Sequence, residues 1–545
     1  MNCDRDIPDF EATIRYHERS KHRFDRYAPS PGYMDWENQP TPFRFYQGVE
    51  PEPLPFIAKD PGGGQEGLYL RSRHRTSPVD RSAVAAFLEL SLALSAWKMA
   101  GAGRWSLRIN PSSGNLHPTE AHLILPPVGD RPAGRCHYSP FLHALEPLAR
   151  VPDRLWQKVE AHLGSTSFLL GLSSIFWRES WKYGERAFRY CQHDAGHALA
   201  AAAFSAALLG WKVTPLSAMS DRQIEQVLGF DQINWHPEEK EHADLLCAVH
   251  PADAAVPSPD LPDEIILEFS SLPLSGRPNR LSRKQVRWQA IAEVAGSTQK
   301  PEGGTQSSPL PAAAFIDDPG ASLSAAQAIR RRRSALDFNP EFMLPRRQFL
   351  AMLDKTRPRA DTPPFDAAFG PPEVHLLIFA HRIEGLDSGM YLLLRNPAHG
   401  DLLRGAFHPH FSWDLVEPDL PLFALEHGDF RQIAMRVSCH QHIAADGAFS
   451  LAMIARFREV VRAAPWQYRR LFWESGMIGQ VLYLEAEARG ARGTGIGCYF
   501  DDAVHELAGI QDGRFQSMYH FTVGHPVNDP RLETRPPYAH LDNDR

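Results

Sequence analysis

The sequence predicts an α+β protein in which two related units are joined in one chain. Three observations lead to this fold class. The chain has 545 residues, which exceeds the usual size of a single hydrophobic core. Its composition, with 43% hydrophobic and 23% charged residues, is typical of a globular protein. Landmarks of the first half also recur in the second half at a constant spacing.

The repeated landmarks are glycines and aspartates in a fixed order, separated by 280 positions. The pairs at this offset are Gly196 with Gly476, Gly210 with Gly490, Asp221 with Asp501, and Gly229 with Gly509. A constant offset indicates tandem duplication of one α+β unit. Two such units are expected to imitate a homodimer, with their long apolar helices packed across a pseudo-two-fold axis.

The first half is expected to contain a leader, a folded unit and a connecting segment. Residues 1–75 are polar, aromatic and rich in Pro and Gly, which favours an extended leader that wraps a core. Residues 76–262 form the first unit, and residues 263–315 connect it to the second, with a flexible linker at 296–311. Hydrophobic periodicity predicts helices at 82–100, 150–163, 180–209 and 221–228, strands at 122–125 and 245–250, and a hairpin at 136–145.

The second unit is expected at residues 316–545. Its periodicity predicts helices at 322–338, 449–463 and 474–489, strands at 374–381, 430–442 and 520–524, and a hairpin at 385–394. The strand at 430–442 would place His440 and His442 on one face, where they could bind a metal. Apart from Cys439 no further ligand lies at a suitable spacing, so a structural role is favoured.

The overall composition argues against several classes of function. The 58 basic and 65 acidic residues give a net charge of −7 without a long basic block, which disfavours nucleic-acid binding. No apolar run reaches about 18 residues, so no membrane span is expected. The N-terminal residues are polar and acidic and show no targeting peptide. Six scattered cysteines without a CxxC motif favour free thiols in a reducing cytoplasm.

Residues 105–120, WSLRINPSSGNLHPTE, are the strongest candidate for a ligand-binding segment. The small residues Ser112, Ser113 and Gly114 would let the backbone approach a flat ligand closely. Arg108 adds five donors and a permanent charge, which suit a phosphate or an electron-rich ring. The alternative is a proline-stiffened loop between helices, and the local sequence favours neither interpretation.

The two halves differ where a ligand site would lie. The matching stretch of the second half, FGPPEVHLLIFA, lacks both the Arg and the serines. The second half instead has an arginine run at 330–333, followed by Ser334, and a glycine-rich loop at 493–502, GTGIGCYFDD. Arg and Ser at the end of a helix are phosphate-binding donors, although an arginine run alone is more often a solvated face. Because each half holds what the other lacks, we expect one composite ligand site and one degenerate site.

These segments resemble the flavin-dependent nitroreductase superfamily, in the SagB-type branch that includes azoline-oxidising dehydrogenases of peptide natural-product pathways. The resemblance covers roughly residues 80–250 and 320–527. It implies two fused nitroreductase-like units, each with a central, mostly antiparallel sheet and flanking helices, that form a pseudo-dimer. It also implies that one FMN binds between the two units.

Three segments of the family contact the flavin, and each has a counterpart here. An Arg-Arg-Ser segment contacts the phosphate, an Arg-x-x-Pro-Ser-x-Gly segment lies against the isoalloxazine ring, and a glycine-rich loop closes over the flavin. The cofactor-binding residues implied by the resemblance are, in that order, Arg332, Arg333 and Ser334; Arg108, Pro111, Ser112, Ser113, Gly114 and Asn115; and Gly493, Gly495, Ile496 and Gly497. Family members often carry a further Arg where this chain has Leu336, so Arg330 and Arg331 are expected to assist in phosphate binding.

The azoline-oxidising members also carry an adjacent Lys-Tyr pair near the flavin, and this chain has Lys182 and Tyr183. The resemblance implies that these two residues form a catalytic acid/base pair, because a buried Lys can accept a proton and a neighbouring Tyr can donate or relay one. The alternative is that the pair packs at a helix terminus against the leader.

The expected function is that of a cytoplasmic FMN-dependent oxidoreductase. Its flavin would accept a hydride in the two-electron oxidation of a heterocyclic or peptide-derived small molecule. Neither nucleic acid nor a membrane is an expected partner, and further homo-oligomerisation stays open. One alternative is an NAD(P)H-dependent nitro or quinone reductase, which needs a ring face that the Trp- and Tyr-rich leader leaves open. The other is an FMN-binding or scaffold protein without turnover.

Overall fold

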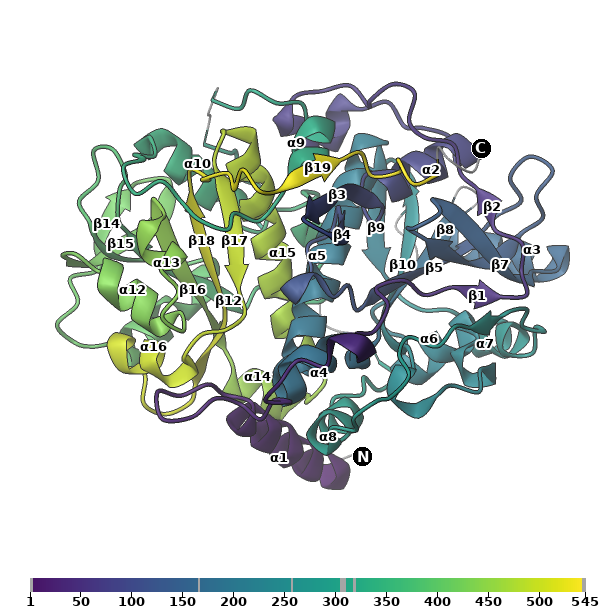
Figure 1. Ribbon diagram of the computed structural model, residues 1–545, viewed down its shortest axis with the longest axis horizontal. Helices are drawn as coiled ribbons and strands as arrows, with labels where there is room; N and C mark the ends of the chain where they lie inside the picture. The colour runs from purple at the N-terminus through teal and green to yellow at the C-terminus, as the bar shows by residue number, and fades with distance from the viewer. Residues whose placement is uncertain (1–2, 165–166, 256–257, 304–309, 317–319, 542–545) are drawn as a thin grey trace.

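The computed structural model describes residues 3–164, 167–255, 258–303, 310–316 and 320–541 (Figure 1). Two units lie side by side, and each is built on a seven-stranded sheet. The predicted α+β class, with antiparallel sheets and flanking helices, is confirmed. No helix in these ranges is long and apolar enough to cross a membrane.

The first sheet has the strand order β2-β7-β6-β5-β8-β10-β9, and its neighbouring strands run antiparallel. Its outer face is covered by three helices, whose Trp156, Ile224 and Ile266 belong to one buried cluster. The strands are β2 (Glu52–Pro53), β5 (Thr119–Leu125), β6 (Gly134–Ser139), β7 (Ala144–Arg150), β8 (Phe168–Ser174), β9 (Trp211–Pro215) and β10 (His242–Pro251), and the helices are α3 (Asp153–Leu163), α6 (Asp221–Leu228) and α7 (Asp263–Ser270).

The second sheet has the order β14-β15-β13-β12-β16-β18-β17, again antiparallel throughout. Three helices cover its outer face through a cluster that includes Leu403, Ala434 and Val504. The strands are β12 (Val374–Ala380), β13 (Gly389–Leu393), β14 (Asp414–Glu417), β15 (Leu420–His427), β16 (Phe449–Arg456), β17 (Arg492–Ile496) and β18 (Phe515–Gly524), and the helices are α11 (Gly400–Ala406), α12 (Arg431–Val437) and α16 (Asp501–Ala508).

Six of the seven strands are connected in the same order in the two sheets. They are β7-β6-β5-β8-β10-β9 in the first sheet and β15-β13-β12-β16-β18-β17 in the second. They differ at one edge, because β2 precedes its whole sheet in the chain whereas β14 lies between β13 and β15. Five further helices are α2 (Arg81–Glu89), α4 (Phe176–Tyr183), α9 (Ala325–Arg331), α10 (Arg346–Lys355) and α13 (Ile443–Asp446). A short ribbon pairs β1 (Tyr46–Gln47) with β11 (Arg277–Pro278).

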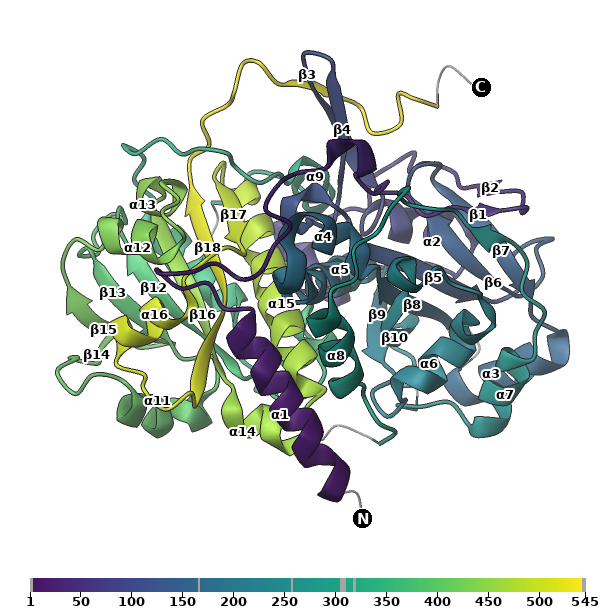
Figure 2. The same cartoon turned by 60° about the horizontal axis from the view of Figure 1, so that its bottom comes forward.

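Two central helices of 22 residues, α5 (Ala187–Leu208) and α15 (Gln467–Ala488), lie between the sheets (Figures 1 and 2). They start 280 positions apart, at the predicted offset. The helices meet at Gly196 and Gly476. A Cβ at Gly196 would lie 2.2 Å from Trp473 O, and one at Gly476 would lie 2.2 Å from His193 O. Both positions therefore need glycine for the backbones to approach so closely.

A third sheet attaches the C-terminal segment of the second unit to the first unit. It contains β3 (Leu94–Ala100), β4 (Gly103–Arg108) and β19 (Glu533–Arg535) in the order β19-β3-β4. Figure 2 shows the β3–β4 hairpin projecting from the body, with the yellow C-terminal segment running across it from one unit to the other. Beyond β19, Trp97 Nε1 donates to Pro537 O over 2.8 Å, and Tyr538 OH donates to Pro140 O over 3.1 Å.

The predicted extended leader is wrong in its first part, because α1 (Cys3–Arg19) is a helix. It packs against α8 (Gln289–Ser297) and α14 (Arg458–Ala463) at the base of the molecule (Figure 2). Tyr16 contacts the rings of Phe188 and Tyr468, with centroids 5.7 and 6.2 Å apart, so α1 bridges the two units. The helix is stabilised by this tertiary packing, which its polar composition does not reveal.

Two predicted helices contain strands. Residues 82–100 form α2 and then β3, which pairs with β4 and β19. Residues 449–463 form β16 and then α14, and β16 pairs with β12 and β18. Strand β16 is buried on both faces and shows no polar alternation, and the first four residues of β3 are buried as well, so both sequences resemble that of a buried helix. The fully buried strand β8 was missed for the same reason.

The predicted strand at 430–442 is also wrong. These residues form α12, and Cys439 and His440 follow it with positive φ angles of 53° and 59°. His440 and His442 therefore do not share a strand face. Within the described ranges, no group of three or more His, Cys, Asp or Glu side chains is placed to hold a metal ion.

The predicted helix at 180–209 is divided into α4 and α5. Gly184 interrupts it with a φ of 57°, and a Cβ there would lie 2.4 Å from Pro29 O of the leader. Only residues 325–331 of the predicted helix at 322–338 are helical, as α9, and only β13 of the hairpin at 385–394 is a strand.

The predicted flexible linker at 296–311 lies partly outside the described residues, at 304–309. The described part includes Lys300, which is buried and donates from Nζ to Met219 O over 2.8 Å. Residues 298–303 are thus bound to the first unit, and the composition alone does not reveal this contact.

Several predicted elements are confirmed. The helix at 221–228 coincides with α6, which has a capping box at Ser220 and Gln223 and ends at Gly229 with a φ of 77°. The predicted strands at 122–125, 245–250, 374–381 and 520–524 fall in β5, β10, β12 and β18, the hairpin at 136–145 is β6–β7, and the helices at 150–163 and 474–489 fall in α3 and α15.

We predict that Gly196→Ala lowers the free energy of unfolding by about 3 kcal/mol, because its Cβ would meet a backbone carbonyl that cannot move independently of α15. Gly296→Ala in α8 is the matched control, since a Cβ there has no heavy atom within 4 Å, and it should be neutral or stabilise by up to about 1 kcal/mol. Denaturant unfolding of the two variants tests this. Equal stability of Gly196→Ala and Gly296→Ala would contradict the close crossing.

Candidate functional site

A cavity of about 660 Å³ lies at the junction of the two units. The first unit contributes the β3–β4 hairpin, the loop 109–117 and one face of α5. The second unit contributes the residues that follow α9, part of β17 and the segment 527–534. The walls therefore come from segments that are hundreds of residues apart in the chain, so the site is composite.

Most of the predicted site residues line this cavity. They are Arg108, Pro111, Ser112, Ser113, Gly114, Asn115, Tyr183, Arg332, Arg333, Ser334, Gly495, Ile496 and Gly497. Two predicted residues are not part of the lining. A Cβ at Gly493 would lie 2.6 Å from the ring of Phe521, so this glycine serves the packing of β17 on β18. Lys182 is half-buried, with Nζ 5.1 Å from the ring centroid of Tyr183.

Arg332 connects the two units at the loop 109–117. Its Nε donates to Ile109 O and its Nη2 donates to Arg108 O, each over 3.0 Å. The guanidinium also lies over the ring of Tyr483, 5.1 Å from the centroid. The second unit thus holds the backbone of the first unit's loop through one buried side chain.

The small residues of this loop are fixed at the cavity surface. Gly114 has a φ of 58°, and a Cβ there would lie 2.4 Å from Tyr183 OH. Ser113 donates to Asp194 Oδ1 from its backbone N over 3.1 Å and from its Oγ over 3.2 Å. Ser112 Oγ accepts a bond from His117 N over 2.7 Å. The predicted need for glycine at position 114 thus has a steric cause.

Positive side chains gather on one side of the cavity. Arg333 donates to backbone carbonyls, Lys98 Nζ donates to Thr534 Oγ1 over 2.6 Å, and Arg492 Nε lies 3.6 Å from Glu487. Burial lowers the pKa of Arg333 to about 9. Burial, together with Arg333 and Arg492, also lowers the pKa of Lys98. Such an excess of positive charge on half-buried side chains suits an anionic group such as a phosphate.

The structure directs Arg330 and Arg331 away from this cluster. Arg330 donates to Asp60 over 2.5 Å and to Glu89 over 2.9 Å, and the side chain of Arg331 is 63% exposed. Neither lines the cavity. The expectation that they would replace the Arg missing at Leu336 is therefore wrong, and Lys98 and Arg492 supply the charge instead.

Four buried polar atoms in the cavity wall have no hydrogen-bond partner among the residues that the structure describes. They are Arg108 Nε, Asn110 Oδ1 and the two ring nitrogens of His117. Unpartnered buried polar groups are rare because each costs free energy. Their position on the ligand-binding segment supports a polar ligand at this wall.

Strand β17 and the loop after it bring their backbone to the cavity at two glycines, Gly495 and Gly497. A Cβ at Gly495 would lie 1.9 Å from Tyr519 OH, and one at Gly497 would lie 2.5 Å from the ring of Tyr190. Gly495 N donates to Tyr483 OH over 2.9 Å, and Tyr483 OH shares a 2.8 Å hydrogen bond with Ser334 Oγ. The glycine-rich loop is thus packed against aromatic rings.

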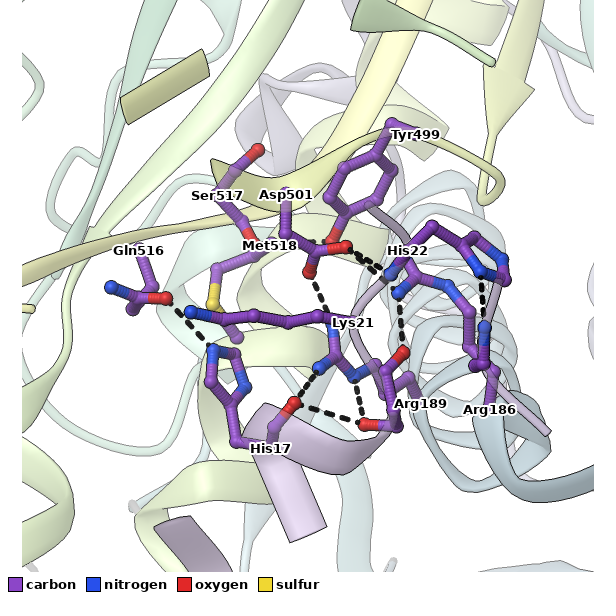
Figure 3. A network of polar contacts seen from close by, with 12 residues as sticks. His17, Lys21, His22, Arg186, Arg189, Tyr499, Asp501, Gln516, Ser517 and Met518 are labelled. Carbon is purple, nitrogen blue, oxygen red and sulfur yellow. Dashed lines mark hydrogen bonds and ion pairs between the residues drawn. The ribbon is translucent and has the colours of Figure 1, made fainter. Parts of the chain in front are cut away.

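A buried ionic network around Asp501 anchors this loop (Figure 3). Asp501 accepts bonds from Arg189 Nη1 over 2.6 Å, from Arg186 Nη1 over 2.9 Å and from His22 N over 3.1 Å. Burial alone would raise the pKa of Asp501, but the two arginines outweigh it and hold that pKa below its usual range. Arg186 Nη2 also donates to Gly497 O over 3.1 Å. The leader, α5 and the loop are thereby joined at one point.

Two buried carboxyl groups, Glu179 and Asp194, face the loop 109–117. Burial raises the pKa of Asp194 to about 7. Burial, together with the charge of Asp194, raises the pKa of Glu179 well above its usual range. Ser112 Oγ donates to Glu179 Oε1 over 3.5 Å. The pair can therefore hold or release a proton near neutral pH, close to the cavity.

Helix α5 contributes side chains to the cavity that were not predicted from the sequence. Tyr190, Asp194 and His197 line the cavity and follow the spacing i, i+4 and i+7, which places them on one helix face. This polar stripe in an Ala-rich helix was the available signal. Lys98 and Arg492 had no such signal, because the pairing of distant strands brings them to the cavity.

The pseudo-equivalent position of the second unit is nearly closed. A shift of 280 carries Tyr190, Asp194 and His197 onto residues that border a cavity of about 20 Å³. These residues are Arg470, Glu474 and Met477. A space of this size is on the order of the volume of one water molecule.

Large side chains fill this second position. Arg395 forms an ion pair with Glu474, and its guanidinium lies 4.9 Å from the ring centroid of Phe365. The rings of Phe369 and Trp473 pack with centroids 5.3 Å apart. The second position thus lacks the space for a flavin ring system.

Comparisons with known proteins identify the fold. Residues 73–239 match the family described as "Nitroreductase family". A crystal structure of a putative nitroreductase from Anabaena variabilis ATCC 29413 is similar with a TM-score of 0.66 and 20% sequence identity, over 95% of this chain and 99% of that chain. No protein of curated function matches the chain.

Two further structures are similar over smaller parts of the chain. A putative nitroreductase from Ralstonia eutropha JMP134 has a TM-score of 0.28 and 14% identity, over 42% of this chain and 98% of that chain. The E. coli microcin synthetase McbBCD complex with truncated pro-MccB17 bound has a TM-score of 0.26 and 17% identity, over 46% of this chain and 94% of that chain. Residues 73–239 therefore match the nitroreductase family model, and the chain shares its overall fold with the Anabaena protein.

Proposed function

We propose that the protein is an FMN-dependent oxidoreductase with one flavin in the composite cavity. The observation that carries this proposal is that the three segments expected to bind flavin come from both units and meet at one cavity. The nitroreductase family domain supports an oxidoreductase. The nearly closed second position supports a single flavin for each chain.

The residues present fit FMN in three respects. Lys98, Arg333 and Arg492 offer a cationic end for the phosphate. Gly114 and Gly495 let the hydroxyls of Tyr183 and Tyr519 pack where a Cβ would lie, which holds both rings at the cavity wall beside a flat ligand. Arg108 Nε and Asn110 Oδ1 offer an unused donor and acceptor in the wall, as the polar edge of an isoalloxazine ring requires.

We further propose a two-electron oxidation of a heterocyclic or peptide-derived substrate, in which bound FMN accepts the hydride. The resemblance to azoline-oxidising enzymes supports this substrate class. The exposed side chains of Leu336 and Val527 line the cavity, so they would offer an apolar surface to a substrate at its mouth. This wall belongs to the second unit, and no residue of the N-terminal leader is part of the lining within the described ranges. The leader therefore leaves the cavity open, which is the condition that the alternative function, an NAD(P)H-dependent reductase, requires for binding a nicotinamide.

Tyr183 is the proposed proton relay, because oxidation of the substrate releases a hydride to the flavin and a proton that a protein group must take up. Burial raises the pKa of Tyr183 well above its usual range, so its hydroxyl keeps its proton at neutral pH. Its OH lies at the surface of the loop beside Gly114. Lys182 is then a positioning residue, whose charge acts on Tyr183 from outside the cavity. Asp194 and Glu179, whose pKa values are raised, would take up the proton that Tyr183 relays.

We expect Arg492→Gln to weaken FMN binding by about 10-fold, because one charge-assisted contact to the phosphate is lost. Riboflavin carries the same ring without the phosphate, so its affinity should change by less than about 2-fold. Fluorescence titration with both ligands measures the difference, and Arg331→Gln, at an exposed arginine outside the cavity, is the control. An equal loss for both ligands would exclude a phosphate at this end.

With a thiazoline-bearing peptide as substrate, Tyr183→Phe should retain FMN and slow conversion to the thiazole by about 100-fold, because the relay for the proton that leaves the substrate is removed. Lys182→Gln should slow the reaction by about 10-fold, because the positive charge beside Tyr183 is removed. Lys182→Arg keeps that charge and should restore the rate. Single-turnover reduction of the bound flavin gives the rates. Wild-type rates in Tyr183→Phe would remove this residue from the mechanism.

A further inference from the structure

Two cysteines meet at the wall of the cavity. Cys498 follows Gly497 and lines the cavity, and Cys439 follows α12. Their Sγ atoms are 2.7 Å apart, about 0.7 Å more than the length of a disulfide bond. Both cysteines are free and half-buried. A small movement of either side chain would bring the two sulfur atoms to bonding distance.

The backbone around the pair is held in an unusual conformation. Cys439 and His440 have φ angles of 53° and 59°, in the left-handed region that non-glycine residues rarely adopt. The side chain of Gln441 donates to Ser438 O over 3.0 Å and to Cys498 O over 3.1 Å, which ties the two cysteine-bearing segments together. Strained conformations of this kind cluster at functional sites. Here the strain presents Cys439 Sγ to Cys498.

The electrostatic surroundings distinguish the two sulfur atoms. The hydrogen bond between the thiols lowers the pKa of Cys498 and raises the pKa of Cys439, and His22 and Arg186 further favour the thiolate of Cys498. The pair therefore shares one proton, with the negative charge on the sulfur that lines the cavity. A thiolate beside a thiol is the arrangement that precedes formation of a disulfide bond.

The other described thiols have a different environment. Cys136, Cys191 and Cys247 are fully buried, and burial raises the pKa of each above its usual range. None of them lines the cavity. Reactivity of a thiol requires access and a lowered pKa, which Cys498 has and these three cysteines lack, so we expect them to be structural.

We propose that Cys439 and Cys498 form a redox-active pair that exchanges two electrons with the flavin of the neighbouring cavity. This inference rests on the proposed function, because it requires FMN as the electron partner. In the forward direction the Cys439 S–H bond breaks and the Sγ–Sγ bond forms. The two electrons and the proton pass to oxidised FMN, which becomes the reduced anion, so charge and hydrogen balance. In the reverse direction reduced flavin opens the disulfide and restores one thiol and one thiolate.

The pair would give the protein an electron capacity beyond that of its flavin. A flavin alone takes up two electrons, whereas a flavin with an adjacent disulfide takes up four. Dehydrogenation of a substrate could then be followed by transfer of its two electrons to the disulfide, which leaves the flavin oxidised for a second turnover. A small-molecule disulfide could remove the stored electrons by thiol–disulfide exchange at Cys498, since this sulfur faces the cavity.

The test is an anaerobic reductive titration of the FMN-loaded protein with dithionite, after oxidation by glutathione disulfide and its removal. Wild-type protein should consume about four electrons for each flavin. Cys439→Ser should consume about two, since it leaves the cavity lining intact but cannot form the disulfide. Cys247→Ala, at a buried thiol outside the cavity, should behave as wild type.

A thiol count on the same samples separates the possible failures. Alkylation in denaturant should label four of the six cysteines before titration and all six after it, with Cys439 and Cys498 as the two that change. Protein that binds FMN but consumes two electrons and has six labelled cysteines throughout would overturn the redox pair and leave the proposed function intact. Protein that binds no FMN would overturn both.

Discussion

The close crossing of α5 and α15 is the constraint on which the cavity depends. At Gly196 and Gly476 each helix lies against a carbonyl oxygen of the other, at a distance that excludes any side chain. This contact brings the α5 face with Tyr190, Asp194 and His197 opposite Tyr483 of α15, and all four side chains line the cavity. A glycine inside a helix costs up to about 1 kcal/mol relative to alanine, so two such positions are retained for packing rather than for helix stability. The composite site follows from this crossing, because neither unit closes it alone.

The same crossing produces two pseudo-equivalent positions, and the side chains decide which one is open. On one side, small residues at 112–114 and glycines of β17 leave about 660 Å³, and Lys98, Arg333 and Arg492 supply positive charge. On the other side, Arg395, Phe365 and Trp473 fill the space to about 20 Å³. The buried network of Asp501 adds to the asymmetry, since Arg186 holds the carbonyl of Gly497 at the open position. The geometry therefore accounts for one open cavity in a chain that has two similar units.

Contiguous features of the site could be predicted from the sequence, whereas features assembled by tertiary contacts could not. The loop from Arg108 to Asn115 is a continuous segment whose small residues indicate close approach to a ligand. Lys98 and Arg492 reach the cavity through strand pairing, and the helix α1 is stabilised by both units, so neither leaves a local pattern. Buried strands such as β8 and β16 lack the alternation that distinguishes a strand from a helix. The similarity of the two units could be predicted because the length of the central helices and the positions of their glycines agree, whereas most other side chains differ.

The number of flavins bound by each chain tests the account most directly. Protein saturated with FMN, freed of excess ligand by gel filtration and denatured would release its flavin for measurement by absorbance against the protein concentration. One FMN for each chain is the predicted result, because one position is open and the other is filled. Two FMN for each chain would contradict the closed second position, and failure to retain any FMN would contradict the composite flavin site itself.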